Sequence, residues 1–307
     1  MLKRWMRAVG HLALLRFGVR DRLIRWIHNP DTAKSEEFAV PFFGLVYRGN
    51  FDTFIDWSVY YYGAYAREEL RLMEDLLVSM HQPVVMDIGA NVGHHTLFAS
   101  RKAKHVLAFE PFFEVANKLR QKLLENAINN VRLFEFALGE KNEKASYKKP
   151  KGHNTGTGSF ISFGNDNETL DLEIRIGDEV LEQNAIKDVH FIKIDTEGFE
   201  PHVLNGLAKT LVRCRPIVFF EWSQGVRGQL DHRLSTIFPQ DYTFYLFVPD
   251  IVVFKLFRKM SYRLAATTDH WPDGNLLAMP IEAMVRLKNM NPKPAVLEKI
   301  EKLWKFA

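Results

Sequence analysis

From Pro83 onward, apolar runs typical of buried strands alternate with segments of helical periodicity. The runs are "PVVMDIG", "HVLAFEP", "VRLFEFAL", "FIKIDTEG" and "PIVFFEW", followed later by "YTFYLFV" and "NLLAMP". Strands that are apolar throughout are typical of parallel sheets that helices cover on both faces. The sequence therefore predicts an α/β fold with a doubly wound, mostly parallel sheet of seven strands.

A tight turn follows the first run, which ends in Asp87. Gly89 and Gly93 stand four residues apart in it, with Asn91 between them. Glycines at such a turn let a ligand approach backbone that a side chain would block. A dinucleotide fingerprint has glycine where Asn91 stands, and the Gly-Lys-Ser/Thr of a P-loop does not follow this strand. A carboxylate directly before the turn suits a ligand that carries ammonium and sulfonium groups.

The second run ends in Glu110, twenty-three residues after Asp87. An acid at the tip of the neighbouring strand can accept hydrogen bonds from both hydroxyls of a ribose. The alternative is an ordinary solvated strand end. Together, the glycine turn and the two strand-end acids indicate S-adenosylmethionine as the cofactor.

The fourth run continues into an acidic stretch, "FIKIDTEGFEP". Asp195, Glu197 and Glu200 fall inside six residues directly after the apolar part. The carboxyl ends of parallel strands are where ligands of such folds bind. These acids are therefore candidates for the reaction itself, and a solvated strand exit is the alternative.

The first thirty residues are strongly basic, with seven basic residues against one acid. Apolar residues at three-to-four spacing predict a basic amphipathic helix, broken at Gly10 or Gly18. Its longest uncharged stretch, Ala8 to Leu15, is far shorter than the roughly 20 residues of a membrane span. Two interpretations stay open: peripheral attachment to an anionic membrane surface, or packing on the domain or in a dimer.

Composition limits the classes of partner and the compartment. The chain has 41 basic and 37 acidic residues, so outside the basic N-terminus it is close to neutral. A nucleic-acid-binding protein would need a basic face on the folded domain, so no such partner is expected. The single cysteine, Cys214, excludes an internal disulfide. We expect a cytoplasmic protein, with contact to the inner face of the membrane if the basic helix attaches there.

The pattern divides the chain into four parts. We expect a basic helical extension over 1–30, a hairpin and helical cap over 31–80, a cofactor-binding domain over 81–285 and a helical tail over 286–307. An irregular polar insertion after the third run is a solvated loop or a lid over the ligand edge.

The chain resembles the FkbM-type family of S-adenosylmethionine-dependent methyltransferases. The resemblance covers roughly Phe38 to Pro280 and is carried by these motifs, in order: "DIGANVGHHT", "AFEP", "FALGE", "FIKIDTEGFEPHVLNG", "PIVFFEW" and "GNLLAMP". It implies a Rossmann-like class I methyltransferase fold. The departures are His94, His95 and the basic N-terminal extension.

The resemblance also implies roles for individual residues. The residues implied to bind the cofactor are Asp87, Gly89, Asn91, Gly93 and Glu110, and those implied on the reaction side are Asp195, Glu197 and Glu200. A hydroxyl acceptor needs a base within hydrogen-bond reach, for which Asp195 is the candidate. Alternatively, Asp195 and Glu221 hold Mg²⁺, which would lower the pKa of the hydroxyl.

Family members are usually O-methyltransferases, so we expect methyl transfer to a hydroxyl of a carbohydrate, glycolipid or related metabolite. A non-catalytic scaffold in a glycan-assembly complex is the first alternative. Such a scaffold would not need the acids at 195, 197 and 200, so their presence counts against it. A dinucleotide-dependent oxidoreductase is the second, and Asn91 in the glycine turn disfavours it.

Overall fold

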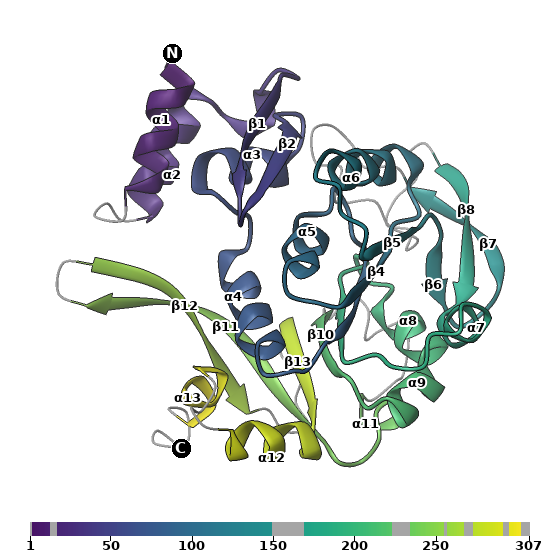
Figure 1. Ribbon diagram of the computed structural model, residues 1–307. Helices are drawn as coiled ribbons and strands as arrows, with labels where there is room; N and C mark the ends of the chain where they lie inside the picture. Colours follow the sequence, from purple (N-terminus) through teal and green to yellow (C-terminus); the bar gives the residue numbers. More distant parts are fainter. Residues whose placement is uncertain are drawn as a thin grey trace.

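The computed structural model describes residues 2–12, 17–148, 169–222, 234–254, 257–266, 273–290 and 295–301. Its centre is an eight-stranded sheet in the order β12-β11-β13-β10-β9-β3-β4-β5 (Figure 1). The strands are β3 (Val84–Ile88), β4 (His105–Phe109), β5 (Val131–Phe134), β9 (Phe191–Ile194), β10 (Ile217–Trp222), β11 (Tyr242–Phe254), β12 (Phe257–Ala266) and β13 (Gly274–Pro280). From β5 to β10 neighbouring strands are parallel, and β13 is antiparallel to both β10 and β11. The predicted fold class is confirmed, with one strand more than expected, β12.

Helices cover both faces of this sheet, because successive side chains of its strands point to opposite faces. Val85 belongs to the core beneath α4, α5 and α6, whereas Met86 belongs to the core beneath α7, α8 and α9. These helices are α4 (Arg67–Leu77), α5 (His94–Ser100), α6 (Phe113–Glu125), α7 (Gly177–Gln183), α8 (Glu200–Gly206) and α9 (Ala208–Arg213). The continuous apolar runs of the sequence are thus buried on two sides.

The sequence predicted one strand for the third apolar run, but the structure divides this run into two strands. Its first half forms β5, and its second half forms β6 (Ala137–Gly139), which pairs with β8 (Thr169–Ile176) in a separate sheet of order β6-β8-β7. A Cβ at Gly206 would lie 1.9 Å from the carbonyl oxygen of Gly139, so β6 packs directly on α8. β6 therefore pairs with β8 and not with β4. The polar insertion begins with β7 (Glu143–Lys148), and its residues 149–168 lie outside the described part.

The N-terminal part contains the expected hairpin and helix pair. β1 (Glu37–Phe42) and β2 (Leu45–Asn50) are antiparallel, and α3 (Phe54–Tyr62) precedes α4. Before them lie α1 (Leu2–His11), α2 (Phe17–Ile27) and a short 3₁₀ turn, η1 (Pro30–Thr32). α1 and α2 lie beside the hairpin in Figure 1.

The break between α1 and α2 falls after His11, so the prediction of a break at Gly10 or Gly18 is wrong. Gly10 lies inside α1, where a Cβ would come 2.1 Å from the carbonyl oxygen of Tyr61. This glycine therefore permits close packing of α1 on α3 rather than a bend. Within the described ranges, no helix is long and apolar enough to cross a membrane.

The C-terminal part supports α4 from the far edge of the sheet. β12 pairs with β11 in a long hairpin, and the fully buried Tyr262 of β12 donates a hydrogen bond to Asp75 of α4 at 2.8 Å. The remaining helices are α11 (Leu234–Ile237), α12 (Ile281–Asn289) and α13 (Ala295–Glu301). α12 crosses the boundary that the sequence suggested at residue 285.

Candidate active site

The glycine turn, residues 89–93, connects β3 to α5 in a conformation that few side chains tolerate. Gly89 has φ 79° and Asn91 has φ 51°. A Cβ at residue 89 would lie 1.8 Å from the carbonyl oxygen of Asp195, which ends β9. The turn therefore lies against the end of the neighbouring strand, and only glycine fits there.

Glu110 is held in place by the backbone of this same edge. It follows β4 and is 7% exposed. One carboxylate oxygen accepts the backbone N–H of Asn91 at 2.9 Å, and the other accepts that of Phe112 at 2.9 Å. Burial raises the pKa of Glu110 to about 7, against the lowering effect of these two bonds. Because a carboxylate offers about four acceptor sites, two remain for a ligand.

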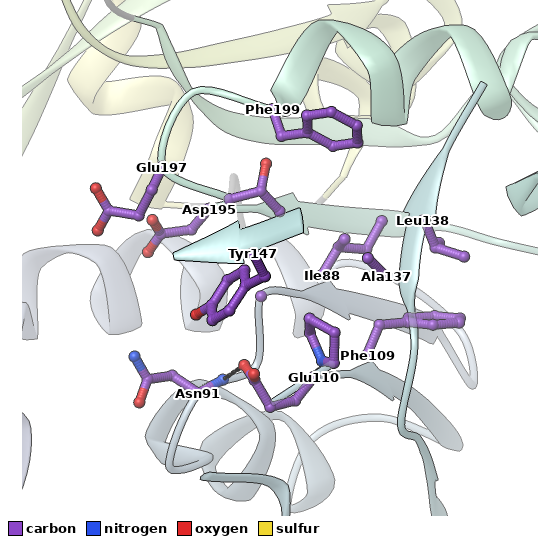
Figure 2. A pocket seen from close by; sticks show the side chains of 13 residues that line it. Ile88, Asn91, Phe109, Glu110, Ala137, Leu138, Tyr147, Asp195, Glu197 and Phe199 are labelled. Atoms are coloured by element: carbon purple, nitrogen blue, oxygen red, sulfur yellow. Dashed lines mark hydrogen bonds between the residues drawn. The ribbon is translucent and has the colours of Figure 1, made fainter. Parts of the chain in front are cut away.

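A pocket joins the glycine turn to the acid turn, residues 195–199. Figure 2 shows Asn91 and Glu110 on one side of it, Asp195 and Glu197 on the other, and Tyr147 of β7 between them. Its lining residues are Ile88, Gly89, Asn91, Phe109, Glu110, Pro111, Ala137, Leu138, Tyr147, Asp195, Thr196, Glu197 and Phe199. The departure of β6 from the main sheet is what brings Ala137 and Leu138 to this site.

Two of the predicted cofactor-binding residues do not line the pocket. Asp87 is 1% exposed, and one of its oxygens accepts the hydroxyl hydrogen bond of Thr96 at 2.5 Å. Its other oxygen, Oδ1, is buried without a hydrogen-bond partner among the described residues. Gly93 begins α5 with φ 88°, and a Cβ there would lie 2.2 Å from Leu119 Cδ1. Gly93 thus serves the packing of α6 against the turn.

The acid turn is shaped by Glu200, which is 1% exposed. One oxygen of Glu200 accepts hydrogen bonds from the backbone and the hydroxyl of Thr196, at 2.7 and 3.0 Å, and from Gly198 N at 3.3 Å. Glu197 has φ 52°, an unfavourable value for a residue with a side chain. Glu200 therefore holds the turn in which Asp195 and Glu197 reach the pocket, and does not line the pocket itself.

Asp195 and Glu197 have opposite electrostatic surroundings. Partial loss of solvation would raise the pKa of Asp195, whose side chain is still 46% exposed, but the Lys193 ammonium, 3.1 Å from its carboxylate, lowers it below the ordinary value. Partial loss of solvation raises the pKa of Glu197 to about 7, and the charges of Asp195 and Glu221 add to this shift. Near neutral pH, Asp195 is a fixed anion while Glu197 can take up and release a proton.

Two further residues, which the sequence motifs did not indicate, lie behind this turn. Lys193 is 2% exposed and lies among carboxylates, of which Asp195, Asp87 and Glu69 raise its pKa against the effect of burial. Glu69 of α4 accepts a hydrogen bond from Asn275 at 3.0 Å, and burial raises its pKa to about 7. A lysine inside the apolar strand "FIKI" was a usable signal for Lys193, whereas nothing local distinguishes Glu69 from other acids of its helix.

The two histidines that depart from the family pattern are buried here. His94 and His95 are 3% and 4% exposed, and their ring centroids are 3.8 Å apart. His95 Nε2 lies 3.2 Å from a carboxylate oxygen of Glu69, although without the geometry of a hydrogen bond. Burial lowers the pKa of both imidazoles, so both are neutral at pH 7.

The candidate metal ligands are Asp195 and Glu221. Burial raises the pKa of Glu221, and the nearby charge of Asp195 raises it further. In the described part of the chain, no group of three or more His, Cys, Asp or Glu side chains is arranged to hold a metal ion.

Comparison with known proteins bears on this geometry. Residues 87–252, more than half of the chain, match the model of the methyltransferase FkbM domain. The chain belongs to this family. The matched region of the FkbM domain contains the glycine turn, Glu110 and the acid turn, and the predicted family is confirmed.

Two curated relatives match part of the chain. One is the hexuronic acid methyltransferase AglP of Haloferax volcanii, 27% identical over 128 residues, which are 42% of this chain and 51% of the relative. The other is methyltransferase 1 of Beauveria bassiana, 26% identical over 143 residues, which are 40% of this chain and 57% of the relative. The matched segments thus span about half the length of these relatives.

Among solved structures, methyltransferase FkbM from Methylobacillus flagellatus is similar at a TM-score of 0.40 and 16% identity, over 64% of this chain and 43% of that one. A SAM-dependent methyltransferase from Agrobacterium tumefaciens is similar at a TM-score of 0.44 and 8% identity, over 82% of this chain and 72% of that one.

Proposed function

We propose that this chain is an S-adenosylmethionine-dependent O-methyltransferase that acts on a hydroxyl of a carbohydrate, a glycolipid or a related metabolite. The observation that carries the proposal is the pocket in which Glu110 stands opposite Asp195 and Glu197 (Figure 2). The wall with Glu110 can accept hydrogen bonds from a ribose. The wall with Asp195 and Glu197 offers carboxylates to an acceptor hydroxyl that must lose its proton. Family membership supports the same reaction.

The donor side fits S-adenosylmethionine by its shape and by its acceptors. Gly89 leaves backbone open to a ligand, and Glu110 has two acceptor sites left for ribose hydroxyls. When bound, the cofactor would supply an electrophilic methyl group on a sulfonium. Asp87 would not contact the cofactor directly, because its Oδ1 is buried and Lys193 already lies beside it. It would contribute its charge from behind the glycine turn.

For the acceptor side we favour Glu197 as the base and Asp195 as an orienting anion. A general base works best when its pKa is close to the working pH, which holds for Glu197 and not for Asp195. Glu197 would take the hydroxyl proton as the new carbon–oxygen bond forms and the carbon–sulfur bond breaks. Asp195, fixed by Lys193, would accept a hydrogen bond from the same acceptor, and Glu200 would position both.

Mg²⁺ remains a competing proposal for the acceptor side, with Asp195 and Glu221 as its protein ligands. Its support is the proximity of the two carboxylates and the exposed side chain of Asp195, 46% accessible. Oxygen ligands of this kind suit Mg²⁺, which also keeps several waters.

The carbohydrate acceptor is supported by the relative AglP, which is named a hexuronic acid methyltransferase. The experiment is a titration of the protein with S-adenosylmethionine and with NAD, followed by single-turnover transfer to a panel of glycans and glycolipids. Binding of the first cofactor alone and methylation of a panel member are expected. Tighter binding of NAD would replace the proposal by an oxidoreductase, and cofactor binding without transfer to any hydroxyl would favour a scaffold.

We also propose that the N-terminal extension contacts an anionic membrane at the cytoplasmic face. α1 buries Met6 and exposes Trp5, which is 73% accessible. α2 buries Ile24 and exposes Trp26, which is 84% accessible. Arg4 and Arg22 are exposed as well. Tryptophan and arginine together suit the interface of an anionic bilayer.

Sedimentation with vesicles that contain phosphatidylserine tests this contact. Replacing Trp5 and Trp26 together by Ser should weaken binding at least tenfold, and added salt should weaken it further because each nearby basic residue contributes about 1 kcal/mol. Val285→Ser, at a residue of α12 that is 51% exposed, is the control. Equal sedimentation of all three proteins would assign the extension to packing alone.

A further inference from the structure

A second pocket lies between α2, the connection from α3 to α4, and β11, and encloses about 340 Å³. Its lining includes Phe17 and Arg20 of α2, Tyr65 and Arg67 at the start of α4, and Pro249 of β11. In Figure 1, α2 and the β11–β12 hairpin lie on the same side of the molecule, on the left of the view. Aromatic rings and guanidinium groups from residues before the family-matched region thus line one cavity.

The acids that line this pocket are already engaged. Asp21 accepts two hydrogen bonds from Arg25 Nε, at 3.0 and 2.9 Å, and one from the Tyr62 hydroxyl at 2.9 Å. Glu68, whose pKa burial raises, lies close enough to Arg67 for the charge of Arg67 to lower that pKa in turn. Arg67 thus has an acid beside it, whereas Arg20 forms no ion pair with the acids of the described residues.

Arg20 carries an unsatisfied donor. One of its terminal nitrogens donates to the carbonyl oxygen of Gly10 at 2.5 Å, but its Nε is buried with no acceptor among the described residues. Burial lowers the pKa of Arg20, and the charge of Arg67 lowers it further, so the two guanidinium groups repel each other. His11, at the end of α1, has its pKa lowered by burial and then by Arg7, Arg67 and Arg20. A buried donor among repelling cations is relieved by an anion.

The start of α4 also borders this pocket, and its first turn already carries two acids, Glu68 and Glu69. α4 has eleven residues, and its N-cap, Ala66, provides no side-chain hydrogen bond to the first turn. Ala66 itself lines the pocket. The backbone N–H groups at a helix start favour negative charge.

Tyr65 lies near both this pocket and the acid turn. It lines the pocket, yet burial and then the charges of Glu69, Asp195 and Glu197 raise the pKa of its hydroxyl. Its ring also contacts His94 edge-on, with the centroids 5.4 Å apart. Tyr65 is therefore close to both the second pocket and the acid turn.

We propose that this second pocket binds an anionic group, a phosphate or a carboxylate, on the part of the acceptor remote from its methylated hydroxyl. Arg20 and Arg67 hold the anion, since guanidinium groups match both oxyanions, and Phe17 and Tyr65 pack against the adjoining apolar or sugar portion. This specificity rests on the proposed methyltransferase function. The anion belongs either to a soluble acceptor or to a lipid headgroup.

The test uses phenyl phosphate and benzoate as anionic probes and phenol as the uncharged analogue, each titrated calorimetrically into the full chain. We expect at least one anion to bind at least tenfold more tightly than phenol. Arg20→Gln and Arg67→Gln should each weaken that binding at least tenfold. Arg20→Gln removes the hydrogen bond to Gly10 and can disturb α1. Arg67 is exposed, so Arg67→Gln should remain folded in either case. Arg213→Gln on α9, outside the pocket, is the matched control.

Titration of the same variants with S-adenosylmethionine separates this inference from the proposed function. Unchanged cofactor affinity with lost anion binding supports both. Anion binding that depends on Arg20 in a protein without affinity for the cofactor would sustain the pocket and remove the methyltransferase proposal. Anion affinity equal to that of phenol, or unchanged in both arginine variants, overturns the pocket.

Vesicles that contain phosphatidic acid distinguish the two sources of the anion. If phenyl phosphate releases the wild-type protein from these vesicles, a lipid headgroup occupies the pocket. If the protein binds the vesicles and phenyl phosphate independently, the anion belongs to a soluble acceptor. Both results require the arginine dependence measured in solution.

Discussion

The two walls of the active-site pocket are built by different means. The glycine turn and Glu110 rely on backbone: a left-handed Gly89, and two N–H groups that fix one carboxylate. The acid turn relies on buried charged side chains: Lys193, two residues before Asp195 on β9, and Glu69 from the distant helix α4. Backbone geometry is set within a few residues, whereas a balance of buried charges needs the whole fold. The first wall should therefore tolerate changes at the second, and the following variants test this independence.

The largest effect is expected from Lys193→Met, which keeps the length of the side chain but removes the charge that compensates Asp87 and Asp195. Loss of one partner from a buried ion pair costs several kcal/mol, and we expect the free energy of unfolding to fall by about 3 kcal/mol at pH 8. Urea denaturation measures this change, with Lys209→Met at an exposed position of α9 as the control. An equal, small loss in both variants would mean that Lys193 does not balance the acids.

Glu197→Gln should reduce methyl transfer about a hundredfold or more, equivalent to about 2.7 kcal/mol, because an amide cannot take the hydroxyl proton. Single-turnover transfer at saturating S-adenosylmethionine measures this. Asp195→Asn should also reduce transfer, and both variants should keep near-normal affinity for the cofactor. Glu182→Gln, at an exposed position of α7, controls for surface charge. Cofactor binding lost together with transfer would show that the two walls are not independent.

Glu110→Ala should weaken S-adenosylmethionine binding by roughly tenfold to a hundredfold, which corresponds to the loss of one hydrogen bond to a charged acceptor, about 1.5–3 kcal/mol. Glu110→Gln is the matched variant, because it keeps one acceptor oxygen while losing the charge. Calorimetric titration gives both affinities. Full affinity in a folded Glu110→Ala protein would discard the ribose assignment.

The smallest effect is on pH dependence. Below pH 7 the raised pKa of Glu197, about 7, leaves the base increasingly protonated, so the transfer rate should fall about tenfold per pH unit. Above pH 7 the rate should level off. Saturating cofactor removes the contribution of Glu110, whose pKa is also about 7. A rate that is flat from pH 5 to 8 would exclude Glu197 as the base.

This contrast between the walls also explains what could be predicted from sequence. Gly89, Asn91 and Glu110 were found because short-range spacing on two strands specifies them. Glu69 was not, because its role depends on packing of α4 over the sheet, and nothing in "REELRLMEDLL" marks one acid as buried. The same limit applies to β6, where a close glycine contact with α8 overrides an apolar run that continues from β5.

The hydrogen bond from Tyr262 to Asp75 has a practical consequence for anyone who wishes to trim this protein. An expression fragment cut to residues 87–252 would include the glycine turn and the acid turn but neither α4 nor β12. It would lack Glu69, and adding α4 back without β12 would leave Asp75, 6% exposed in the full chain, without its tyrosine. A fragment of this protein that keeps both Glu69 and the partner of Asp75 therefore needs the family-matched region together with two segments from opposite ends of the chain.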